Sequence, residues 1–425
     1  MKRSLLIRNG RVVDPRNGLD GKRDVLIKNG RISTRIDKSN CIEIDASGLL
    51  VLPGIIDMHV HLREPGQEDS ETIATGTRAA SRGGVTTVVA MPNTRPPVDG
   101  PALLRRLRLK AGSEASVNIL FCGAVTAGQK GEHLTDMRAL ASAGAAAFSE
   151  DGRPVLDPGI MRTALRAAAK LGRPLLDHAE DPRLSAGGVL HEGQAARRFR
   201  VKGIPSSSET LMVLRDLVLA ERSLAPLHVC HVSCAGTVEL IRQAKRRGLP
   251  VTAEATPHHF TLSDRDIPAG RSADFKMKPP LRSPADRQAV REGLADGTLD
   301  AIATDHAPHH PRLKARGLRE APFGVIGLET LVPLALALVR EGVMPLRRLV
   351  ELMSANPARI LGVESKGHLG PGADADVTLI DPRAAWTVSG DFESKSRNSP
   401  FVGRRMQGRV VMTIVGGEIV YNGKT

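Results

Sequence analysis

The sequence predicts an α/β fold: a (β/α)8 barrel of the TIM type with a small β-rich domain formed from both chain termini. The middle of the 425-residue chain alternates eight short apolar runs with helix-like runs, an alternation typical of such a barrel. Both ends of the chain contain strand-like runs and turn pairs instead. No G-x-G-x-x-G motif follows the first apolar run, which disfavours the rival arrangement, a doubly wound open sheet.

The N-terminal segment predicts short strands joined by tight turns. Residues 5–7 lead into Asn9-Gly10, and residues 25–27 lead into Asn29-Gly30. Asn-Gly pairs are typical of β-hairpins because both residues tolerate a positive φ. We therefore expect a hairpin at the first pair and a second turn at the other.

The C-terminal segment repeats this style. Its strand-like runs lie at residues 377–380, 410–415 and 418–421. Its turn pairs lie at residues 416–417 and 422–423. Residues 1–50 and 365–425 are therefore expected to form one small sandwich-like β domain. Residues 51–364 are expected to form the barrel.

The barrel elements are predicted in chain order. The eight strand-like runs are residues 55–61, 86–91, 117–122, 145–148, 174–178, 227–231, 250–255 and 299–304. Helices are predicted between them, at residues 73–82, 101–111, 159–171, 207–221, 237–247 and 283–294.

Composition narrows the function classes. Hydrophobic residues make up 41% of the chain and charged residues 25%, as in ordinary soluble enzymes. The net charge of +14 suits a small anionic substrate, nucleic acid or anionic lipid. Aromatic residues are only 2% of the chain, so side chains on which bases could stack are scarce. We expect a small anionic substrate and no nucleic-acid partner.

The sequence also predicts a cytoplasmic protein with no membrane partner. Its most apolar stretch, residues 331–339, is far shorter than the ~20 residues of a membrane helix. The N-terminus lacks the apolar core of a signal peptide. The four cysteines form no C-x-x-C pair, which excludes a disulfide scaffold and a Cys-rich zinc module and fits a reducing compartment.

Chemically capable side chains mark the carboxyl ends of most predicted barrel strands. In a barrel these ends converge on one face, where active sites lie. A single histidine in an apolar run is usually a hydrogen-bonded core residue, but packing alone does not explain several in register. These residues are His59, His61, Asn93, Asp151, His178, His231, His258, His259 and Asp305.

The strand-end residues predict a metal centre. His59 and His61 are two positions apart, so a strand presents both imidazoles on one side, where they can chelate one ion. His178 and His231 supply a second pair, and Asp151 and Asp305 add oxygen ligands, Asp151 as a bridge if two ions bind. Four imidazoles with two carboxylates suit zinc, with manganese and cobalt as substitutes.

Asp305 has a second predicted task as the catalytic residue. A carboxylate beside a metal can take a proton from water as the nucleophile forms and return that proton to the leaving nitrogen. The alternative is that Asp305 is only a ligand, and the two roles can coexist.

Arg63 and Asn93 predict a pocket for an anion. A guanidinium holds a carboxylate with two parallel hydrogen bonds, and an amide adds another donor. Each residue taken alone could be an ordinary loop residue. Their positions after the first two barrel strands favour the pocket.

The ordered set of motifs resembles the metal-dependent amidohydrolase superfamily, and within it the long bacterial dihydroorotases. The resemblance covers essentially the whole chain, including both terminal segments. The matching motifs are residues 53–66 (PGIIDMHVHLREPG), 91–94 (MPNT), 148–152 (FSEDG), 177–180 (DHAE), 230–233 (CHVS), 252–259 (TAEATPHH), 303–309 (ATDHAPH) and 321–324 (APFG).

The resemblance implies the reversible cyclisation of N-carbamoyl-L-aspartate to L-dihydroorotate in pyrimidine synthesis, with one or two Zn²⁺ ions per subunit. It implies substrate contacts by His309 and by the backbone of Pro322, Phe323 and Gly324. Asp151 occupies the strand end where many relatives carry a bridging carboxylated lysine. This argues against a hydantoinase or an allantoinase, which resemble the lysine type and are the alternative enzymes.

One position departs from the family pattern. Residues 275–282 (FKMKPPLR) resemble a segment that usually carries Asn where this chain has Lys278. That Asn helps to hold the substrate ring. We therefore count Lys278 among the substrate-binding residues and expect it to alter affinity but not the reaction class.

The expected partners are the small anionic substrate, a second copy in a homodimer, and aspartate carbamoyltransferase in a complex. Two non-enzymatic alternatives remain: an inactive structural partner of that transferase, and a basic nucleic-acid-binding barrel. The intact ligand set disfavours the first. The second gives no reason for histidines and aspartates at strand ends.

A mobile lid is predicted after the last barrel strand. Residues 310–320 are basic and follow His309, at a place where barrel enzymes keep mobile loops. We expect this segment to be disordered or open without substrate and to close over the substrate ring.

Overall fold

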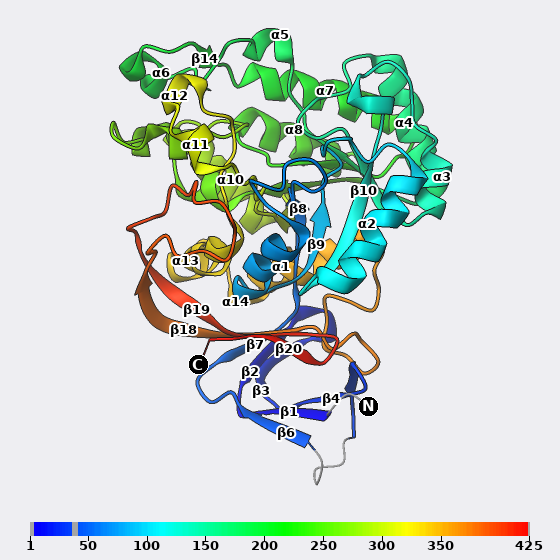
Figure 1. Cartoon of the computed structure of the whole chain (residues 1–425), viewed down its shortest axis with the longest axis vertical. Coiled ribbons are helices and arrows are strands. Elements are labelled where there is room, and N and C mark those ends of the chain that lie inside the picture. The colour runs from blue at the N-terminus through cyan, green and yellow to red at the C-terminus, as the bar shows by residue number, and fades with distance from the viewer. Residues whose placement is uncertain (1–3, 36–40, 424–425) are drawn as a thin grey trace.

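Eight parallel strands form a barrel in the middle of the chain (Figure 1). The computed structural model describes residues 4–35 and 41–423. Neighbouring strands pair in chain order, and a parallel bridge between Val60 and His306 brings the first and last strands together. The predicted barrel is therefore confirmed. Its strands are β8 (Ile55–Val60), β9 (Val85–Ala90), β10 (Asn118–Ala124), β11 (Ala145–Ser149), β12 (Leu175–Asp177), β15 (Leu227–Val229), β16 (Val251–Ala255) and β17 (Ala301–Ile302).

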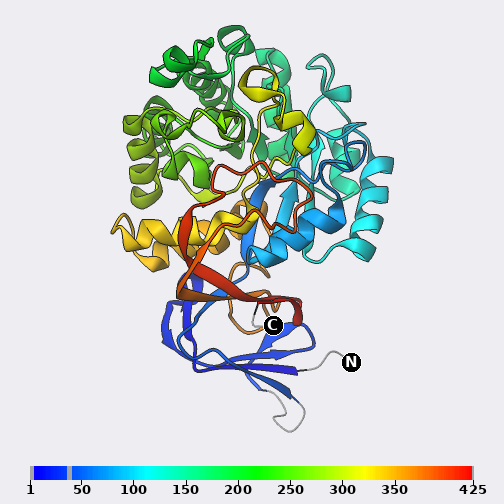
Figure 2. The ribbon, with the colours of Figure 1, turned by 60° about the vertical axis from the view of Figure 1, so that its left-hand side comes forward.

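Helices surround the barrel strands (Figures 1 and 2). The six predicted helices are all present, with ends within three residues of those expected: α1 (Ile73–Arg82), α2 (Pro101–Glu114), α4 (Pro158–Leu171), α7 (Ser207–Glu221), α8 (Ala235–Arg246) and α10 (Pro284–Asp296). Nine further α-helices of the described residues were not predicted. Five of them are short insertions described below, and the other four are α3 (Met137–Ser142), α13 (Leu331–Arg340), α14 (Leu346–Val350) and α15 (Asn356–Leu361).

Local sequence explains where several helices begin. Thr72 and Thr75 form a reciprocal capping pair before α1, and Ser283 and Asp286 form another before α10. The side chain of Asp157 accepts a hydrogen bond from the first turn of α4. Such caps satisfy backbone N–H groups that have no partner within the helix.

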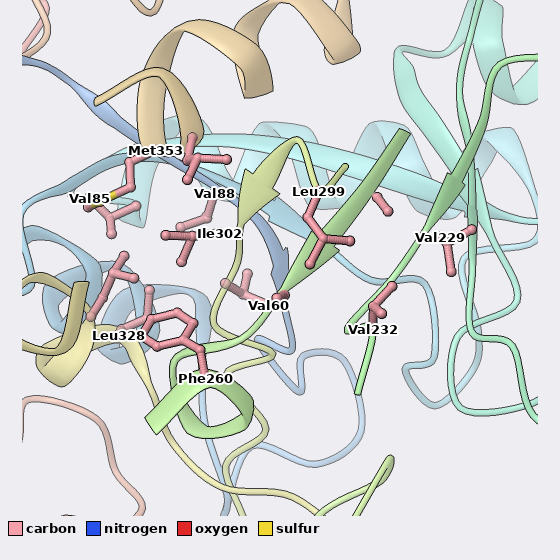
Figure 3. Packing of buried hydrophobic residues seen from close by; sticks show 14 of the residues in the cluster. Val60, Val85, Val88, Val229, Val232, Phe260, Leu299, Ile302, Leu328 and Met353 are labelled. Atoms are coloured by element: carbon pink, nitrogen blue, oxygen red, sulfur yellow. The ribbon is translucent and has the colours of Figure 1, made fainter. Parts of the chain in front are cut away.

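Buried apolar side chains from the barrel strands, the helices and their connections pack together (Figure 3). Val60, Val88 and Ile302, from three different strands, are fully buried, as are Phe260 and Leu328 from the connections. This packing fixes the strands and therefore the positions of the residues that follow them.

Short elements are inserted after three of the strands. They are α5 (Pro182–Ser185), β13 (Leu190–His191), α6 (Gln194–Phe199) and β14 (Gly203–Ile204) after β12, α9 (Pro257–Thr261) after β16, and α11 (Pro311–Lys314) and α12 (Gly317–Glu320) after β17. Each insertion follows the carboxyl end of a strand, the side of the barrel that carries the predicted site.

Two sheets form below the barrel from both ends of the chain (Figure 1). A four-stranded sheet has the order β5-β4-β1-β6, and a six-stranded sheet has the order β20-β19-β18-β7-β2-β3. Their strands are β1 (Ser4–Arg8), β2 (Arg11–Asp14), β3 (Leu19–Lys22), β4 (Val25–Lys28), β5 (Arg31–Ser33), β6 (Cys41–Asp45), β7 (Leu50–Pro53), β18 (Val377–Thr387), β19 (Arg405–Val415) and β20 (Glu418–Asn422).

The expected hairpin at Asn9-Gly10 is wrong, whereas the turn at Asn29-Gly30 joins paired strands. β1 pairs with β4 and β6, and β2 lies in the other sheet. Asn9 does adopt a positive φ of 65°, but its side chain bonds to Asp45. A Cβ atom on Gly10 would lie 2.5 Å from a Val51 methyl carbon. The Asn-Gly pair therefore passes the chain from one sheet to the other.

The connection between β18 and β19, residues 388–404, leaves the terminal sheets and reaches the barrel (Figure 2). It contacts the segment after β8, where Ser396 Oγ donates to the backbone oxygen of Ser70 at 2.7 Å. No helix in the described part of the chain combines the length and apolar character needed to cross a membrane.

Candidate active site

The six predicted metal ligands converge at the carboxyl end of the barrel, and all are nearly inaccessible to solvent. Asp151 Oδ1 lies 3.3 Å from His59 Nε2 and 3.3 Å from His178 Nδ1, and 3.7 Å from His231 Nε2. Asp151 Oδ2 lies 3.4 Å from His61 Nε2. Asp305 Oδ1 lies 3.2 Å from His61 Nε2 and 3.7 Å from His59 Nε2.

The ligand atoms fall into two groups that share one carboxylate. His59, His61 and Asp151 form the first group, and Asp151, His178 and His231 form the second. His59 Nε2, the ring nitrogen that faces the cluster, is fully buried without a hydrogen-bond partner among the described residues. A buried nitrogen without a partner is costly, and Zn²⁺ prefers this combination of imidazole and carboxylate donors. The donor set therefore fits a metal ion.

A second layer of side chains fixes three of the imidazole rings. His59 Nδ1 lies 3.0 Å from Glu254 Oε1, His61 Nδ1 lies 2.9 Å from Asn93 Oδ1, and His178 Nε2 lies 3.3 Å from Glu180 Oε2. In each case the other ring nitrogen faces the cluster. Histidine ligands of metals are commonly held in this way.

Glu254 and Glu180 were not predicted as site residues. Glu254 is fully buried on β16 and also pairs with His228 Nε2 at 3.1 Å. Burial alone would raise the pKa of Glu254, but its bonds to the two histidines lower that pKa to about 2. A charged residue inside an apolar strand was the available sequence signal for Glu254.

Three site residues have a strained backbone. Arg63, His231 and Asp305 adopt φ values of 60°, 37° and 47°, in the left-handed region that non-glycine residues rarely enter. Such conformations persist only where the surrounding structure enforces them, and they cluster at functional sites.

Asp305 is an ionised carboxylate within the cluster. Burial would raise the pKa of Asp305, but its hydrogen bond with His61 and the nearby histidines hold it below its usual range. An ionised carboxylate is an acceptor with several lone-pair sites.

Arg63, which is charged, and His309, which is neutral, lie at the rim of the cluster. Arg63 is 9% exposed; its Nε donates to the Pro308 oxygen at 3.0 Å, and its Nη2 lies 3.5 Å from His309 Nε2. Burial lowers the pKa of Arg63 to about 10, so it stays charged at neutral pH. Burial and the charge of Arg63 lower the pKa of His309 to about 2, which keeps His309 neutral.

Asn93 faces the metal ligands. Besides contacting His61, its Nδ2 donates to Asp151 Oδ2 at 3.3 Å. Its predicted contact with substrate stays a prediction, whereas its contact with two predicted metal ligands is a feature of the structure.

Lys278 lies at the edge of the cluster. Its Nζ lies 2.7 Å from Glu180 Oε1 and 5.2 Å from the centre of the Phe323 ring. Lys278 and Glu180 line a cavity of about 600 Å³. The lysine is therefore linked to His178, a predicted metal ligand, through Glu180.

The segment 322–324 already has internal partners. The Phe323 oxygen lies 2.6 Å from His309 Nε2, and the Pro322 oxygen accepts from Lys314 Nζ at 2.9 Å. The N–H of Gly324 donates to the Lys276 oxygen at 2.9 Å. These bonds hold three of the predicted substrate contacts beside Arg63.

His258 and His259 lie beside the cluster but belong to neither ligand group. His259 Nε2 lies 3.0 Å from the Pro279 oxygen, next to Lys278, and its Nδ1 contacts Thr256. Burial lowers the pKa of His259 to about 4. This histidine therefore supports the segment that carries Lys278.

The predicted lid is an ordered pair of helices, α11 and α12, in the structure. Lys314 from α11 is buried, and its Nζ donates to the oxygens of Ala273, Lys276 and Pro322 at 2.9, 3.2 and 2.9 Å. These bonds join the segment to the site rim. Its closure over substrate stays a prediction.

The sequence of this chain is similar to two protein families and to named dihydroorotases. The family model described as "Dihydro-orotase-like" matches residues 48–236, and that described as "Amidohydrolase family" matches residues 286–421. The chain is 51% identical to the dihydroorotase of Pelotomaculum thermopropionicum and 50% identical to that of Anaeromyxobacter dehalogenans strain 2CP-C. Each match covers 98% of both chains.

Solved structures share the fold at lower identity. L-Hydantoinase from Arthrobacter aurescens has a TM-score of 0.87 at 28% identity, over 99% of this chain and 96% of that one. Dihydropyrimidinase from Brevibacillus agri has a TM-score of 0.86 at 26% identity, over the same shares. The sequence identity of this chain to the two dihydroorotases is nearly twice its identity to these two solved structures. The chain therefore belongs to the dihydroorotases of the amidohydrolase superfamily and is a cyclic amide hydrolase.

Proposed function

We propose that this chain catalyses the zinc-dependent, reversible cyclisation of N-carbamoyl-L-aspartate to L-dihydroorotate in pyrimidine biosynthesis. One observation carries the proposal: two pairs of imidazoles share the Asp151 carboxylate beside the buried guanidinium of Arg63. Metal ligands suit an amide-hydrolysing centre. The buried cation suits a substrate that carries a carboxylate.

His59, His61, Asp151, His178, His231 and Asp305 would hold the metal, as one ion or as two that share Asp151. Zn²⁺ at such a site polarises an amide carbonyl and lowers the pKa of water to near neutrality. Glu254 and Glu180 would keep the rings of His59 and His178 directed at the ion, because each accepts a bond from the outer ring nitrogen.

The side chains divide the remaining tasks. Asp305 takes a proton from water on ring opening and returns it to the ring nitrogen that leaves; in cyclisation the same transfers run in reverse. Arg63 holds the substrate carboxylate, with Asn93 and His309 as further polar contacts. Lys278 and the backbone of Pro322, Phe323 and Gly324 bound the substrate ring.

Arg63 favours dihydroorotate over the substrates of the structural neighbours. Hydantoin and allantoin rings carry no carboxylate, so their binding would leave the buried guanidinium without an anionic partner, which is costly. The structurally similar proteins are a hydantoinase and a dihydropyrimidinase. They make hydantoin the appropriate competing substrate.

The test is turnover of dihydroorotate and N-carbamoyl-L-aspartate by purified enzyme before chelation, after chelation and after addition of zinc. Hydantoin and allantoin serve as competing substrates. We expect activity with the first pair, lost on chelation and restored by zinc. Preference for hydantoin, or full activity in metal-free enzyme, would contradict the proposal. No turnover by zinc-loaded enzyme would favour an inactive structural partner.

We further propose that the enzyme works in the cytoplasm as a homodimer and associates with aspartate carbamoyltransferase. Buried thiols at Cys122, Cys230 and Cys234 suit a reducing compartment. Sedimentation velocity of the enzyme alone, and of a mixture with the transferase, tests both associations. A monomer that does not co-sediment would contradict them.

A further inference from the structure

The connection 388–404 brings one polar side chain to the rim of the site. Asn398 lies in this connection, far from the barrel in sequence, and is 3% exposed. Figure 2 shows the connection rising from β18 and β19 to the barrel. A buried amide needs hydrogen-bond partners, so its contacts show what it holds in place.

The Asn398 side chain makes three hydrogen bonds to the rim. Its Nδ2 donates to the backbone oxygens of Ala307 and Gly324, both at 3.0 Å. Its Oδ1 accepts from the backbone N–H of His309 at 3.2 Å. The amide alone suits this set, because two donors and one acceptor are needed on the same planar group.

These bonds join two stretches that are otherwise separate in sequence. Ala307 and His309 follow Asp305, whereas Gly324 ends the segment that contacts the substrate ring in the proposed function. The backbone N–H of Ile326 also donates to the backbone oxygen of Asn398 at 3.0 Å. Asn398 therefore fixes the spacing between His309 and the 322–324 backbone.

The spacing that Asn398 fixes is tight. Gly324 has a φ of +132°, and a Cβ atom there would lie 2.7 Å from Ala307 Cβ and 2.9 Å from His309 Nε2. His309 also contacts Arg63, so a shift of either stretch moves the group beside the guanidinium. A misplacement of about 1 Å can cost on the order of 100-fold in rate.

We propose that Asn398 is a positioning residue for substrate binding. It acts through His309 and Gly324, and within the described part of the chain its side-chain hydrogen bonds reach none of the predicted metal ligands. This inference rests on the proposed function, because it assigns the rim to dihydroorotate and N-carbamoyl-L-aspartate. The connection 388–404, which joins two strands of a terminal sheet, thereby contributes to a site that lies mainly on the barrel.

The test compares Asn398→Asp and Asn398→Ser with Ser399→Ala. Asp keeps the size of Asn but turns a carboxylate toward two carbonyl oxygens, and Ser is too short to span the gap. Ser399 is the matched control, because it is buried in the same connection. Among the described residues, its hydroxyl forms a hydrogen bond only with the backbone N–H of Phe401. KM and kcat for both substrates, zinc content and the thermal midpoint are measured for each variant.

We expect both Asn398 variants to raise KM by roughly 10- to 100-fold, with kcat changed less and zinc content unchanged. Ser399→Ala should keep KM within about twofold. Wild-type KM in a folded Asn398 variant would overturn the inference, as would an equal rise in Ser399→Ala. If Asn398→Asp fails to fold, Asn398→Ser decides. Failure of the wild-type enzyme to turn over dihydroorotate would instead overturn the proposed function.

Discussion

The two halves of the barrel mouth are built in different ways. The predicted metal ligands lie on or just after strands β8, β11, β12, β15 and β17, and strand pairing sets their positions. The rim that carries Lys278, His309 and Gly324 lies in connections. Its position is set by side-chain bonds from Lys314 and Asn398 to backbone oxygens. The strand-end half is thus fixed by the sheet, and the rim half by distant polar side chains.

This difference predicts two classes of variant. Changes in the strand-end half should alter metal content or turnover, because in the proposed function its side chains hold the ion and move the proton. Changes in the rim half should alter KM while the metal stays bound. The following variants are ordered from the largest expected effect to the smallest.

Asp305→Asn should reduce turnover of dihydroorotate by at least ~100-fold, the lower range for general acid–base catalysis. An amide keeps the size of the carboxylate but is a poor proton acceptor, so much of the metal should remain. Steady-state rates at measured zinc content check this. Near-normal turnover in metal-replete Asp305→Asn would remove Asp305 from the proton-transfer role and leave it as a ligand only.

Arg63→Lys should lower kcat/KM by about 10- to 150-fold, because a charge-assisted hydrogen bond contributes roughly 1.5–3 kcal/mol. Lysine keeps the charge but lacks the planar fork. Arg63→Met should cost more, since the substrate carboxylate then has no counter-charge. Zinc should remain bound in both.

Arg95→Met is the control for Arg63, because Arg95 is an exposed arginine whose charge acts on Arg63. It should leave kcat/KM within about threefold. Wild-type kcat/KM in Arg63→Met would mean that the carboxylate is held elsewhere, and Lys278 would then be the first residue to change.

Glu254→Gln should weaken zinc binding by roughly 10- to 100-fold, the usual cost of losing the partner of a metal-ligating histidine. Activity should return when excess zinc is added, which separates this residue from Asp305. Glu329→Gln is the matched control, because Glu329 is also largely buried but pairs with Arg82 away from the cluster. Equal zinc affinities of wild type and Glu254→Gln, measured by chelator competition, would contradict the orienting role.

Lys278→Asn should have the smallest effect, a rise in KM of about two- to fivefold, because a partly exposed ion pair contributes about 0–1 kcal/mol. The side chain of Lys278 is 29% exposed and already pairs with Glu180. A rise of KM beyond about 50-fold would instead make Lys278 the main holder of the substrate carboxylate. Measuring KM for both substrates distinguishes the small rise from the large one.

The strand-end half was readable from the sequence because it depends on local pattern. The spacing of His59 and His61 sets their common side, and the apolar run before each of Asp151, His178, His231 and Asp305 marks the strand that positions it. The barrel order follows from the alternation of strands and helices. These features need no knowledge of contacts between distant residues.

The rim half was only partly readable because long-range contacts decide it. Asn398 lies 74 positions from Gly324 and 89 from His309, and nothing in its local sequence indicates that contact. Glu254 was hidden in the same way, since its partner His59 is 195 positions away. The predicted hairpin at Asn9-Gly10 was wrong for the same reason, because packing of Gly10 against Val51 prevails over the local turn preference.

Zinc-edge anomalous diffraction from crystals of the zinc-loaded enzyme tests the central claim, that the strand ends build the metal centre, most directly. We expect anomalous peaks ~2.0–2.1 Å from imidazole nitrogens of His59, His61, His178 and His231, with Asp151 between the two pairs of histidines. The number of peaks gives the number of ions per subunit. Zinc bound by residues outside the set of His59, His61, Asp151, His178, His231 and Asp305 would contradict the account.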